Sequence, residues 1–418
     1  MPQIKFIHTA DLHLDTPFKG LSYMNKELAA KIKDATFRAF EKIIDNCISE
    51  NVDFLLIAGD IFDRESQSLG SQIKFVEQLQ RLSKKGISTY FICGNHDPLC
   101  SWMSNLDLPE NVFRFGSAEV GKLTYFKEGT PLADIYGISF QDKALTENIS
   151  LKYELSESGS PFSIALLHGN LAGNAAHGNY APCTITDLEK SNFDYWALGH
   201  IHLTQIVKQT APSIVYPGNP QGRDFGERGK KSCILVELNT SQTPKLSLIS
   251  TQLIRFEQIE IDLTDVTNNS ELTDRITIGI ENIPDLNEED SAIIRLTLKG
   301  RTPLHIILNE NSESLLENLN EGILNSQSFK FIDSIKVATQ PEINLDELKN
   351  GNDFIAEILK ELDDVFLNED KRNQLLESLS NEITGSQLKK ELKNINEDDK
   401  AEILNKAKFV LLDKLLTE

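Results

Sequence analysis

Several apolar segments of this sequence end directly in side chains that can bind a metal ion. In "YFICGNHD", four β-prone residues lead into Gly94 and then into Asn95, His96 and Asp97. A turn can be built from Gly, Asn, Asp or Pro and does not need a histidine. The pattern recurs after four other apolar segments, and the candidate metal ligands are Asp11, His13, Asp60, Asn95, His168, His200 and His202.

The distribution of histidines supports a common site. Five of the eight histidines of the chain belong to these segments. One histidine at the end of a strand is commonly structural, but five at the ends of four apolar segments indicate a shared function. We expect the other three to be structural or solvated residues, namely His8, His177 and His305.

The ligand types indicate which ions would bind. Two carboxylates, one amide and four imidazoles contain too much oxygen for a structural zinc site, and they include no thiolate. The set suits two divalent ions, and we expect Mn²⁺ before Fe²⁺, Zn²⁺ or Mg²⁺. Two ions about 3.5–4 Å apart share a carboxylate and can hold a hydroxide between them. Asp60 is the natural bridge, because the preceding Gly59 leaves room for a close approach.

Alternating strands and helices would bring these residues together. Over the first 250 residues, short apolar segments alternate with amphipathic ones, which predicts an α/β fold. Helices are expected over residues 25–49 and 72–85, between near-continuous apolar strands such as "VDFLLIAGD". In open α/β sheets, ligands bind at the carboxyl ends of the strands, where the candidate residues stand.

Two further regions follow, so that we predict three domains: 1–254, 255–342 and 343–418. The middle region contains three segments of alternating polarity, with helix-like residues 311–324 before the last, and reads as a small α+β domain. The final region is helical, and "DFIAEILKELDDVF" places large apolar residues on one stripe. Its acidic balance argues against a DNA-binding tail.

Composition limits the function classes further. The net charge of −21 repels polyanions at long range, so a nucleic-acid enzyme with this composition needs a local feature that overcomes repulsion. No apolar stretch approaches 18 residues and the N-terminus lacks a cleavage pattern, so we expect neither a membrane span nor a signal peptide. The five cysteines form no CxxC pair, which favours reduced thiols in a cytoplasmic protein.

Five short motifs carry a family resemblance: "DLH", "GDIFDR", "GNHD", "LLHGN" and "GHIH". In order and spacing they resemble the calcineurin-like metallophosphoesterases. Within that superfamily, "IHTADLHLD", "LLIAGDIFDR" and "YPGNPQGRDFGE" resemble the bacterial DNA repair exonucleases of the SbcD/YhaO type, nuclease subunits that work with an SMC-like ATPase. The motifs lie within residues 3–240. The resemblance implies a sandwich of mixed sheets flanked by helices, then a small α+β capping domain and a C-terminal helical segment.

The resemblance also implies individual roles. One ion would be held by Asp11, His13, Asp60 and His202, and the other by Asp60, Asn95, His168 and His200. His96 would stabilise charge on the scissile phosphate and protonate the leaving oxygen, and Asp63 would fix its tautomer. Arg64 and Arg223 are expected to contact the phosphate. The archaeal and eukaryotic repair nucleases carry a histidine where this chain has Asp63, which moves the local pattern toward the phosphatases.

Three function classes follow. The resemblance implies a two-metal DNA phosphodiesterase, an exonuclease or endonuclease in which a metal-bridging hydroxide attacks the phosphate. The alternative is a phosphatase or nucleotidase that acts on a small phosphate ester. A non-catalytic scaffold is disfavoured because no ligand position is missing. The implied partners are DNA and an SMC-like coiled-coil ATPase that binds the C-terminal helices; a homodimer is also allowed, and no membrane is expected.

Overall fold

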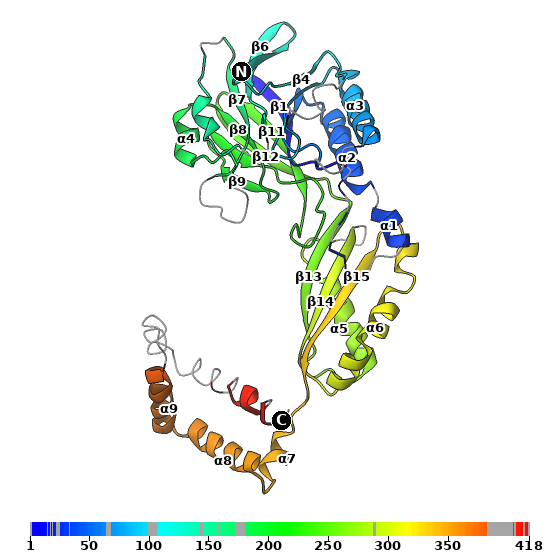
Figure 1. Cartoon of the computed structure of the whole chain (residues 1–418), viewed down its shortest axis with the longest axis vertical. Helices are drawn as coiled ribbons and strands as arrows, with labels where there is room; N and C mark the ends of the chain where they lie inside the picture. Colours follow the sequence, from blue (N-terminus) through cyan, green and yellow to red (C-terminus); the bar gives the residue numbers. More distant parts are fainter. Residues whose placement is uncertain are drawn as a thin grey trace. The chain divides into compact units, whose positions relative to one another are not determined.

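The computed structural model describes most of the chain. The described residues are 2–63, 68–98, 107–142, 145–156, 159–171, 180–286, 290–382, 404, 407–412 and 414–416, except positions 15, 17, 19, 22–25 and 33. Figure 1 shows the helices and strands in the order of the chain. Among the described residues, no helix is both long enough and apolar enough to cross a bilayer.

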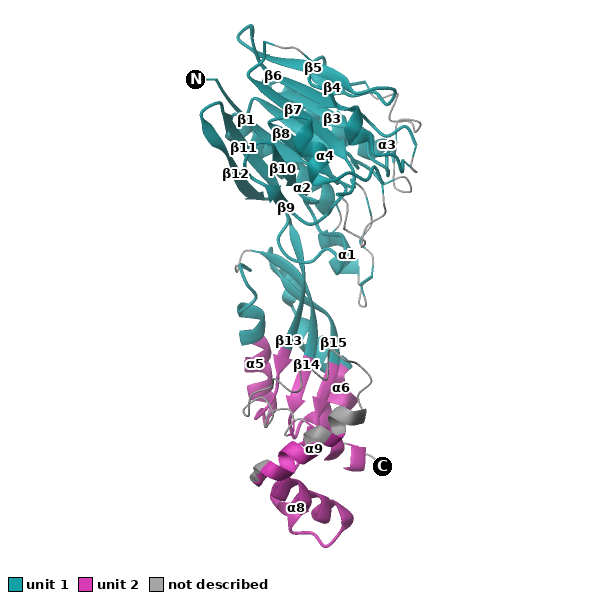
Figure 2. Ribbon diagram, turned by 90° about the vertical axis from the view of Figure 1, so that its left-hand side faces the viewer, with its two compact units in different colours: residues 1–260, 278–297, 313–336 teal, residues 261–277, 298–312, 337–418 magenta. Residues whose placement is uncertain are grey.

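The chain divides into two compact units, which Figure 2 distinguishes by colour. The first unit contains residues 1–260, 278–297 and 313–336, and the second contains residues 261–277, 298–312 and 337–418. Each strand of the middle region runs from the first unit into the second. The predicted domain boundaries at 254 and 342 follow the sequence pattern and stay predictions.

The first unit contains two six-stranded mixed sheets. In the first sheet, four neighbouring strands run parallel to one another. Its order is β12 (Gln242–Ser250), β11 (Ser232–Asn239), β1 (Gln3–Thr9), β2 (Phe54–Ala58), β3 (Ser88–Ile92) and β4 (Val112–Arg114). The second sheet runs β5 (Gly121–Lys127), β6 (Thr130–Gly137), β7 (Phe162–His168), β8 (Tyr195–Gly199), β10 (Ser213–Tyr216) and β9 (Gln205–Lys208).

The sheets pack face to face and are covered by helices on their outer faces. Apolar side chains of both sheets form one core between them, in which the Phe6 ring contacts Phe54 of its own sheet and Tyr195 of the other. A second core lies between the first sheet and helices α2 (Ala35–Ser49) and α3 (Leu69–Ser83), and a third lies between the second sheet and α4 (Ile185–Lys190). Figure 1 shows this layering. The predicted α/β sandwich of mixed sheets is confirmed.

The helices begin and end close to the predicted positions, with one interruption. The helix expected over 25–49 consists of α1 (Lys26–Ile32) and α2. Asp34, which precedes α2, has φ of 60°, and this left-handed conformation cannot continue a right-handed helix. Helix α3 begins after Ser68, whose hydroxyl accepts a hydrogen bond from the Ser71 backbone N–H.

The middle region forms a three-stranded sheet of β13 (Ile254–Asp262), β14 (Ser291–Arg301) and β15 (Lys330–Gln340). Helix α6 (His305–Asn320) starts earlier than the predicted 311–324, and its backbone departs from helical geometry at Asn311. The sequence pattern did not predict α5 (Asn269–Glu281). This helix buries only Leu272 and Ile276 and is rich in β-branched residues, so its apolar periodicity is weak.

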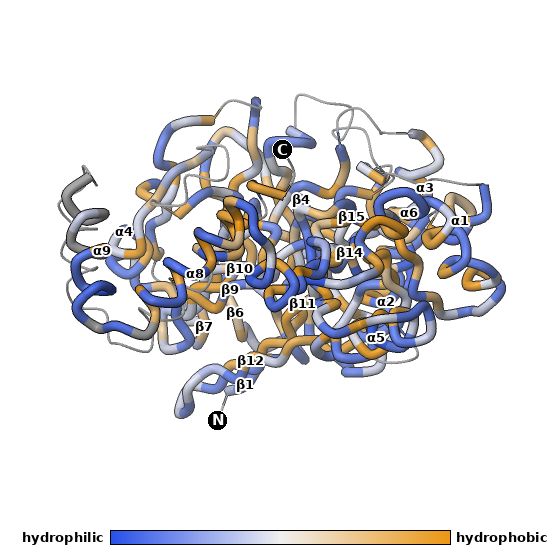
Figure 3. The backbone as a smooth tube through the Cα atoms, turned by 90° about the horizontal axis from the view of Figure 1, so that it is seen from below, coloured by the Kyte–Doolittle hydropathy of each residue, from blue (hydrophilic) through white to orange (hydrophobic). Residues whose placement is uncertain are grey.

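The C-terminal region begins with three helices, α7 (Leu345–Lys349), α8 (Phe354–Leu367) and α9 (Glu369–Glu382). Figure 3 shows apolar and polar residues alternating along α8. Leu359 is fully buried, whereas Phe354 is 67% exposed. Lys408 contacts α8 from the end of the chain, since its Nζ lies 3.5 Å from an Asp363 carboxylate oxygen. The chain therefore covers part of the α8 stripe itself.

Candidate metal centre

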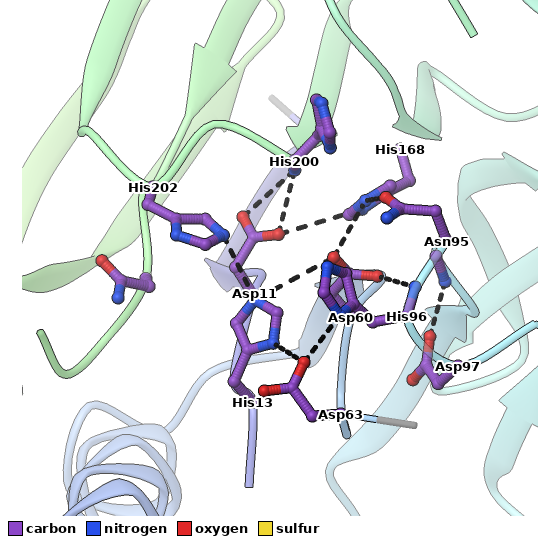
Figure 4. A network of polar contacts seen from close by, with 12 residues as sticks. Asp11, His13, Asp60, Asp63, Asn95, His96, Asp97, His168, His200 and His202 are labelled. Carbon is purple, nitrogen blue, oxygen red and sulfur yellow. Dashed lines mark hydrogen bonds and ion pairs between the residues drawn. The ribbon is translucent and has the colours of Figure 1, made fainter. Parts of the chain in front are cut away.

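The candidate ligands lie where strands of both sheets end. After β1, the Asp11 N–H donates to the Gly59 carbonyl at 3.0 Å, and the His13 N–H donates to the Asp60 carbonyl at 3.1 Å. The segments that follow β1 and β2 therefore continue side by side beyond the sheet. Figure 4 shows how the side chains from these segments meet those that follow β3, β7 and β8.

The backbone at these ligands is strained. Asp11, His13, Asp60 and His200 have φ angles of 52°, 44°, 51° and 102°, although none of them is glycine. The left-handed region costs a non-glycine residue about 1–2 kcal/mol. Strain of this kind persists where the surrounding structure enforces it, and it is concentrated at functional sites.

Three glycines make room for the ligands. A Cβ on Gly59 would lie 2.4 Å from His168 Nδ1, and one on Gly94 would lie 2.2 Å from Asp60 Oδ1. A Cβ on Gly199 would lie 1.9 Å from the Ala58 carbonyl oxygen. Gly59 was expected to make room for its neighbour Asp60, but it makes room for the His168 ring. The space beside the Asp60 carboxylate is created by Gly94.

Two imidazoles face each other at one end of the site. His13 Nε2 and His202 Nε2 lie 3.2 Å apart, and both histidines share a group of nearby donor atoms with Asp11. The other ring nitrogens, both Nδ1, face carboxylates: Asp63 Oδ1 lies 3.1 Å from His13 and Glu227 Oε1 lies 2.6 Å from His202. A carboxylate can only accept, so each Nδ1 carries a proton, and the two Nε2 atoms are left facing each other.

A second group forms around His168. Its Nδ1 donates to the Ala58 carbonyl at 2.9 Å, while its Nε2 lies 3.0 Å from Asn95 Oδ1 and 3.3 Å from Asp60 Oδ2. The same Asp60 oxygen lies 3.9 Å from His13 Nε2. Asp60 therefore stands between the two groups, where a bridging ligand would have to be.

The last expected ligand, His200, is placed differently. Its backbone N–H donates to both Asp11 carboxylate oxygens at 3.0 and 3.1 Å. Its ring packs edge-on against the His168 ring, with centroids 5.3 Å apart. The ring is next to the second group but is not a member of the three clusters of donor atoms found among the described residues.

His96 and Asp63 form a separate pair beside the ligands. Asp63 Oδ1 accepts from His96 Nδ1 at 2.6 Å, the contact that the expected orienting role requires, and Thr16 donates to Oδ2 at 2.6 Å. Against the effect of burial, the hydrogen bonds from His13 and His96 hold the pKa of Asp63 well below its usual range. Burial alone would lower the pKa of His96, but the hydrogen bond to Asp63 and the charges of Asp60 and Asp63 together raise it. The His96 side chain is 39% exposed, so its ring can be reached from solvent.

The two expected phosphate contacts have different outcomes. Arg64 lies outside the described residues. Arg223 is only 15% exposed, and its guanidinium faces two carboxylates, with Nη2 2.6 Å from Glu227 Oε1 and Nη1 3.3 Å from Asp63 Oδ2. A phosphate contact for Arg223 stays a prediction, and the structure adds a set of contacts that the sequence did not suggest.

Two carboxylates near the site were missed. Glu227 contacts His202 and Arg223, and Asp97 accepts from the backbone N–H groups of Gly94 at 2.7 Å and Ile61 at 2.8 Å. Burial and the Asp60 charge raise the pKa of Asp97 to about 7. Asp97 adjoins the quoted "GNHD" ligands, so its position was a signal. Glu227 is one acidic residue among many, and only its place in the fold distinguishes it.

The donor atoms fit a pair of divalent cations. Burial first, and then the Arg223 charge, lower the pKa of His13 to about 4, so its ring is neutral near pH 7 and its Nε2 lone pair can bind a cation. Although burial opposes it, the Asp60 charge raises the pKa of His168 to about 9. In the absence of a metal ion, the His168 ring therefore carries a proton beside the Asp60 carboxylate. Buried carboxylates such as Asp11 and Asp60 are otherwise costly, and a metal ion offsets that cost.

Two parts of the chain match known protein families. Residues 4–203 match the calcineurin-like phosphoesterase family, and residues 256–340 match the middle domain of metallophosphoesterase YhaO. The chain is 36% identical to the uncharacterized metallophosphoesterase YhaO of Bacillus subtilis (strain 168) over 366 residues, which cover 87% of this chain and 88% of that protein.

Two more distant relatives are named for DNA repair and for nuclease activity. The DNA double-strand break repair protein Mre11 of Archaeoglobus fulgidus is 27% identical over 66% of this chain and 63% of its own. A subunit of the nuclease SbcCD of Bacillus subtilis (strain 168) is 25% identical over 56% of this chain and 66% of its own. The extended match to YhaO, together with the family match across all seven candidate ligands, places this chain in the calcineurin-like metallophosphoesterase family, whose members hydrolyse phosphoesters.

Proposed function

We propose that this protein is a two-metal phosphodiesterase that cleaves DNA. The observation that carries the proposal is the position of Asp60 Oδ2, which lies 3.9 Å from His13 Nε2 and 3.3 Å from His168 Nε2. One carboxylate oxygen thus stands between two sets of ring nitrogens, as a site for two adjacent ions requires.

Each ion would have its own ligands, with Asp60 common to both. The first would be held by Asp11, His13, Asp60 and His202, and the second by Asp60, Asn95, His168 and His200. When bound, two Mn²⁺ ions would polarise the phosphate and activate a water molecule. His200 already lies beside the second group, where its ring packs edge-on against the His168 ring.

His96 would act on the phosphate without binding metal. Asp63 accepts from His96 Nδ1, so the other ring nitrogen is directed away from this carboxylate. With its raised pKa, the imidazole can carry the proton that the leaving oxygen requires. Its positive charge would also stabilise negative charge on the phosphate in the transition state.

DNA is the proposed substrate because relatives named for DNA break repair and for nuclease activity match much of this chain. The net charge of −21 opposes DNA at long range. Two divalent ions carry four positive charges against the two negative charges of Asp11 and Asp60, so the site itself would attract phosphate.

Long-range affinity for DNA would come from a partner. We propose that the C-terminal helices dock on the coiled coil of an SMC-like ATPase, an expectation that the exposed Phe354 on α8 supports. A cytoplasmic location is part of the same proposal, since a reducing compartment suits Cys47, Cys93, Cys183 and Cys233, which are buried free thiols.

A phosphatase or nucleotidase is the second candidate. The observation that favours it is Asp63, which replaces the histidine of the repair nucleases and holds His96 at 2.6 Å. An assay with Mn²⁺ on labelled duplex DNA, single-stranded DNA, a diester dye and a monoester dye separates the two candidates. We expect cleavage of DNA and of the diester. Turnover of the monoester alone would refute the nuclease proposal and favour the phosphatase.

A further inference from the structure

Glu227 is the centre of a buried polar network on one side of the metal centre. Its Oε1 lies 2.6 Å from His202 Nδ1, and its Oε2 accepts from the Arg223 backbone N–H at 2.9 Å and from Asn219 Nδ2 at 2.8 Å. The Glu227 side chain is 11% exposed. These contacts hold the carboxylate in one orientation and fix the His202 proton on Nδ1.

Arg223 connects this carboxylate to a second one. Its Nη2 and Nε lie 2.6 and 3.2 Å from the two Glu227 oxygens, and its Nη1 lies 3.3 Å from Asp63 Oδ2. Asp63 in turn accepts from His13 Nδ1. One guanidinium therefore joins the two carboxylates that fix the rings of His13 and His202.

We propose that Arg223 and Glu227 are positioning residues that selectively strengthen one of the two metal sites, the one that contains His13 and His202. The inference rests on the proposed two-metal function and goes beyond it, because it assigns unequal affinities to the two ions. It also gives Arg223 a role other than binding the substrate phosphate.

The asymmetry follows from what lies behind His13, His202 and His168. An ionised carboxylate behind Nδ1 makes the opposite nitrogen of a histidine more basic and a better metal ligand. His13 and His202 both have such a partner. His168 donates instead to the neutral Ala58 carbonyl. The first site should therefore bind its ion more tightly, and the loss of Glu227 should reduce that difference.

Calorimetric titration of the metal-free full chain with Mn²⁺ tests this directly. We expect two binding events in the wild type. Glu227→Gln should weaken one of them by about 10–100-fold, the usual effect of removing such a partner, and leave the other unchanged. Arg223→Gln should weaken the same event by a smaller factor, because the lost contacts with the two carboxylates are partly offset by the removal of a positive charge near His13. Arg228→Gln is the matched control, because Arg228 is exposed and contacts only Gln258, at 3.4 Å, among the hydrogen bonds of the described residues.

The other outcomes each overturn a definite statement. Unchanged affinities for both ions in Glu227→Gln, or equal weakening of both with a lower melting temperature of the metal-free protein, would refute selective positioning. If Glu227→Gln does not fold, Arg223→Gln answers the same question. An Arg223→Gln variant with a raised KM for the diester dye and unchanged Mn²⁺ affinities would make Arg223 a phosphate ligand. Failure of the wild type to bind two ions would refute the proposed function itself.

Discussion

The substitution Gly94→Ala tests whether the space beside Asp60 is essential. A Cβ at this position would lie 2.2 Å from Asp60 Oδ1 and 2.8 Å from the Asp60 backbone nitrogen. Side-chain carbons essentially never approach other atoms closer than 3.0 Å, so the carboxylate and the new methyl group must separate by at least about 0.8 Å.

The backbone on both sides of this contact is held in place. The Gly94 N–H is bonded to Asp97 Oδ1 at 2.7 Å, and Asp97 also accepts from the Ile61 N–H, which directly follows Asp60. The displacement therefore falls on the Asp60 carboxylate. Metal–ligand distances tolerate only about 0.2 Å, so the variant should lose both ions. Misplacement by about 1 Å costs on the order of 10²-fold in rate, which sets the minimum loss of activity.

Elemental analysis of the purified variant and hydrolysis of a diester dye with Mn²⁺ measure these effects. The control is Gly116→Ala, because a Cβ at Gly116 meets no atom within 4 Å. The control should retain both ions and full activity. Circular dichroism should show that both variants are folded. A Gly94→Ala protein with two ions and normal turnover would refute both the close packing and the bridging role of Asp60.

Three further predictions concern the roles of single residues and of the tail. Asp60→Ala should lose both ions, whereas His13→Ala should lose mainly one. If elemental analysis finds two ions in the Asp60 variant, Asp60 does not bridge them. His96→Asn should keep both ions, but its cleavage of labelled DNA should fall by about 10²–10⁴-fold, the usual contribution of a positioned proton donor to the rate. Isolation of this variant without metal would mean that His96 is a metal ligand. Removal of residues 346–418 should leave diester hydrolysis intact and abolish co-elution with an SMC-like ATPase; a large drop in melting temperature with co-elution preserved would mean that the tail serves the fold.

Much of the fold could be read from local sequence pattern. Strands such as β2, which is buried along its whole length, appear as short apolar runs, and the polar residues that follow them mark the strand ends. Parallel strands end at a common edge, so Asp11, Asp60 and Asn95 could be placed together without a structure. Helix α5 was missed because its buried stripe contains only two residues.

The tertiary structure decided which groups contact each ligand. Residues 202 and 227 are separated by β9, β10 and a loop, and no periodicity encodes the 2.6 Å contact between His202 and Glu227. The role of Gly94 was hidden for the same reason, since its contact with Asp60 depends on how β3 lies beside β2. Sequence pattern reports whether a residue is buried, because burial depends on local periodicity. Contacts between distant segments depend on how the sheets and loops pack, so the sequence could suggest candidate ligands but could not suggest the groups that contact them.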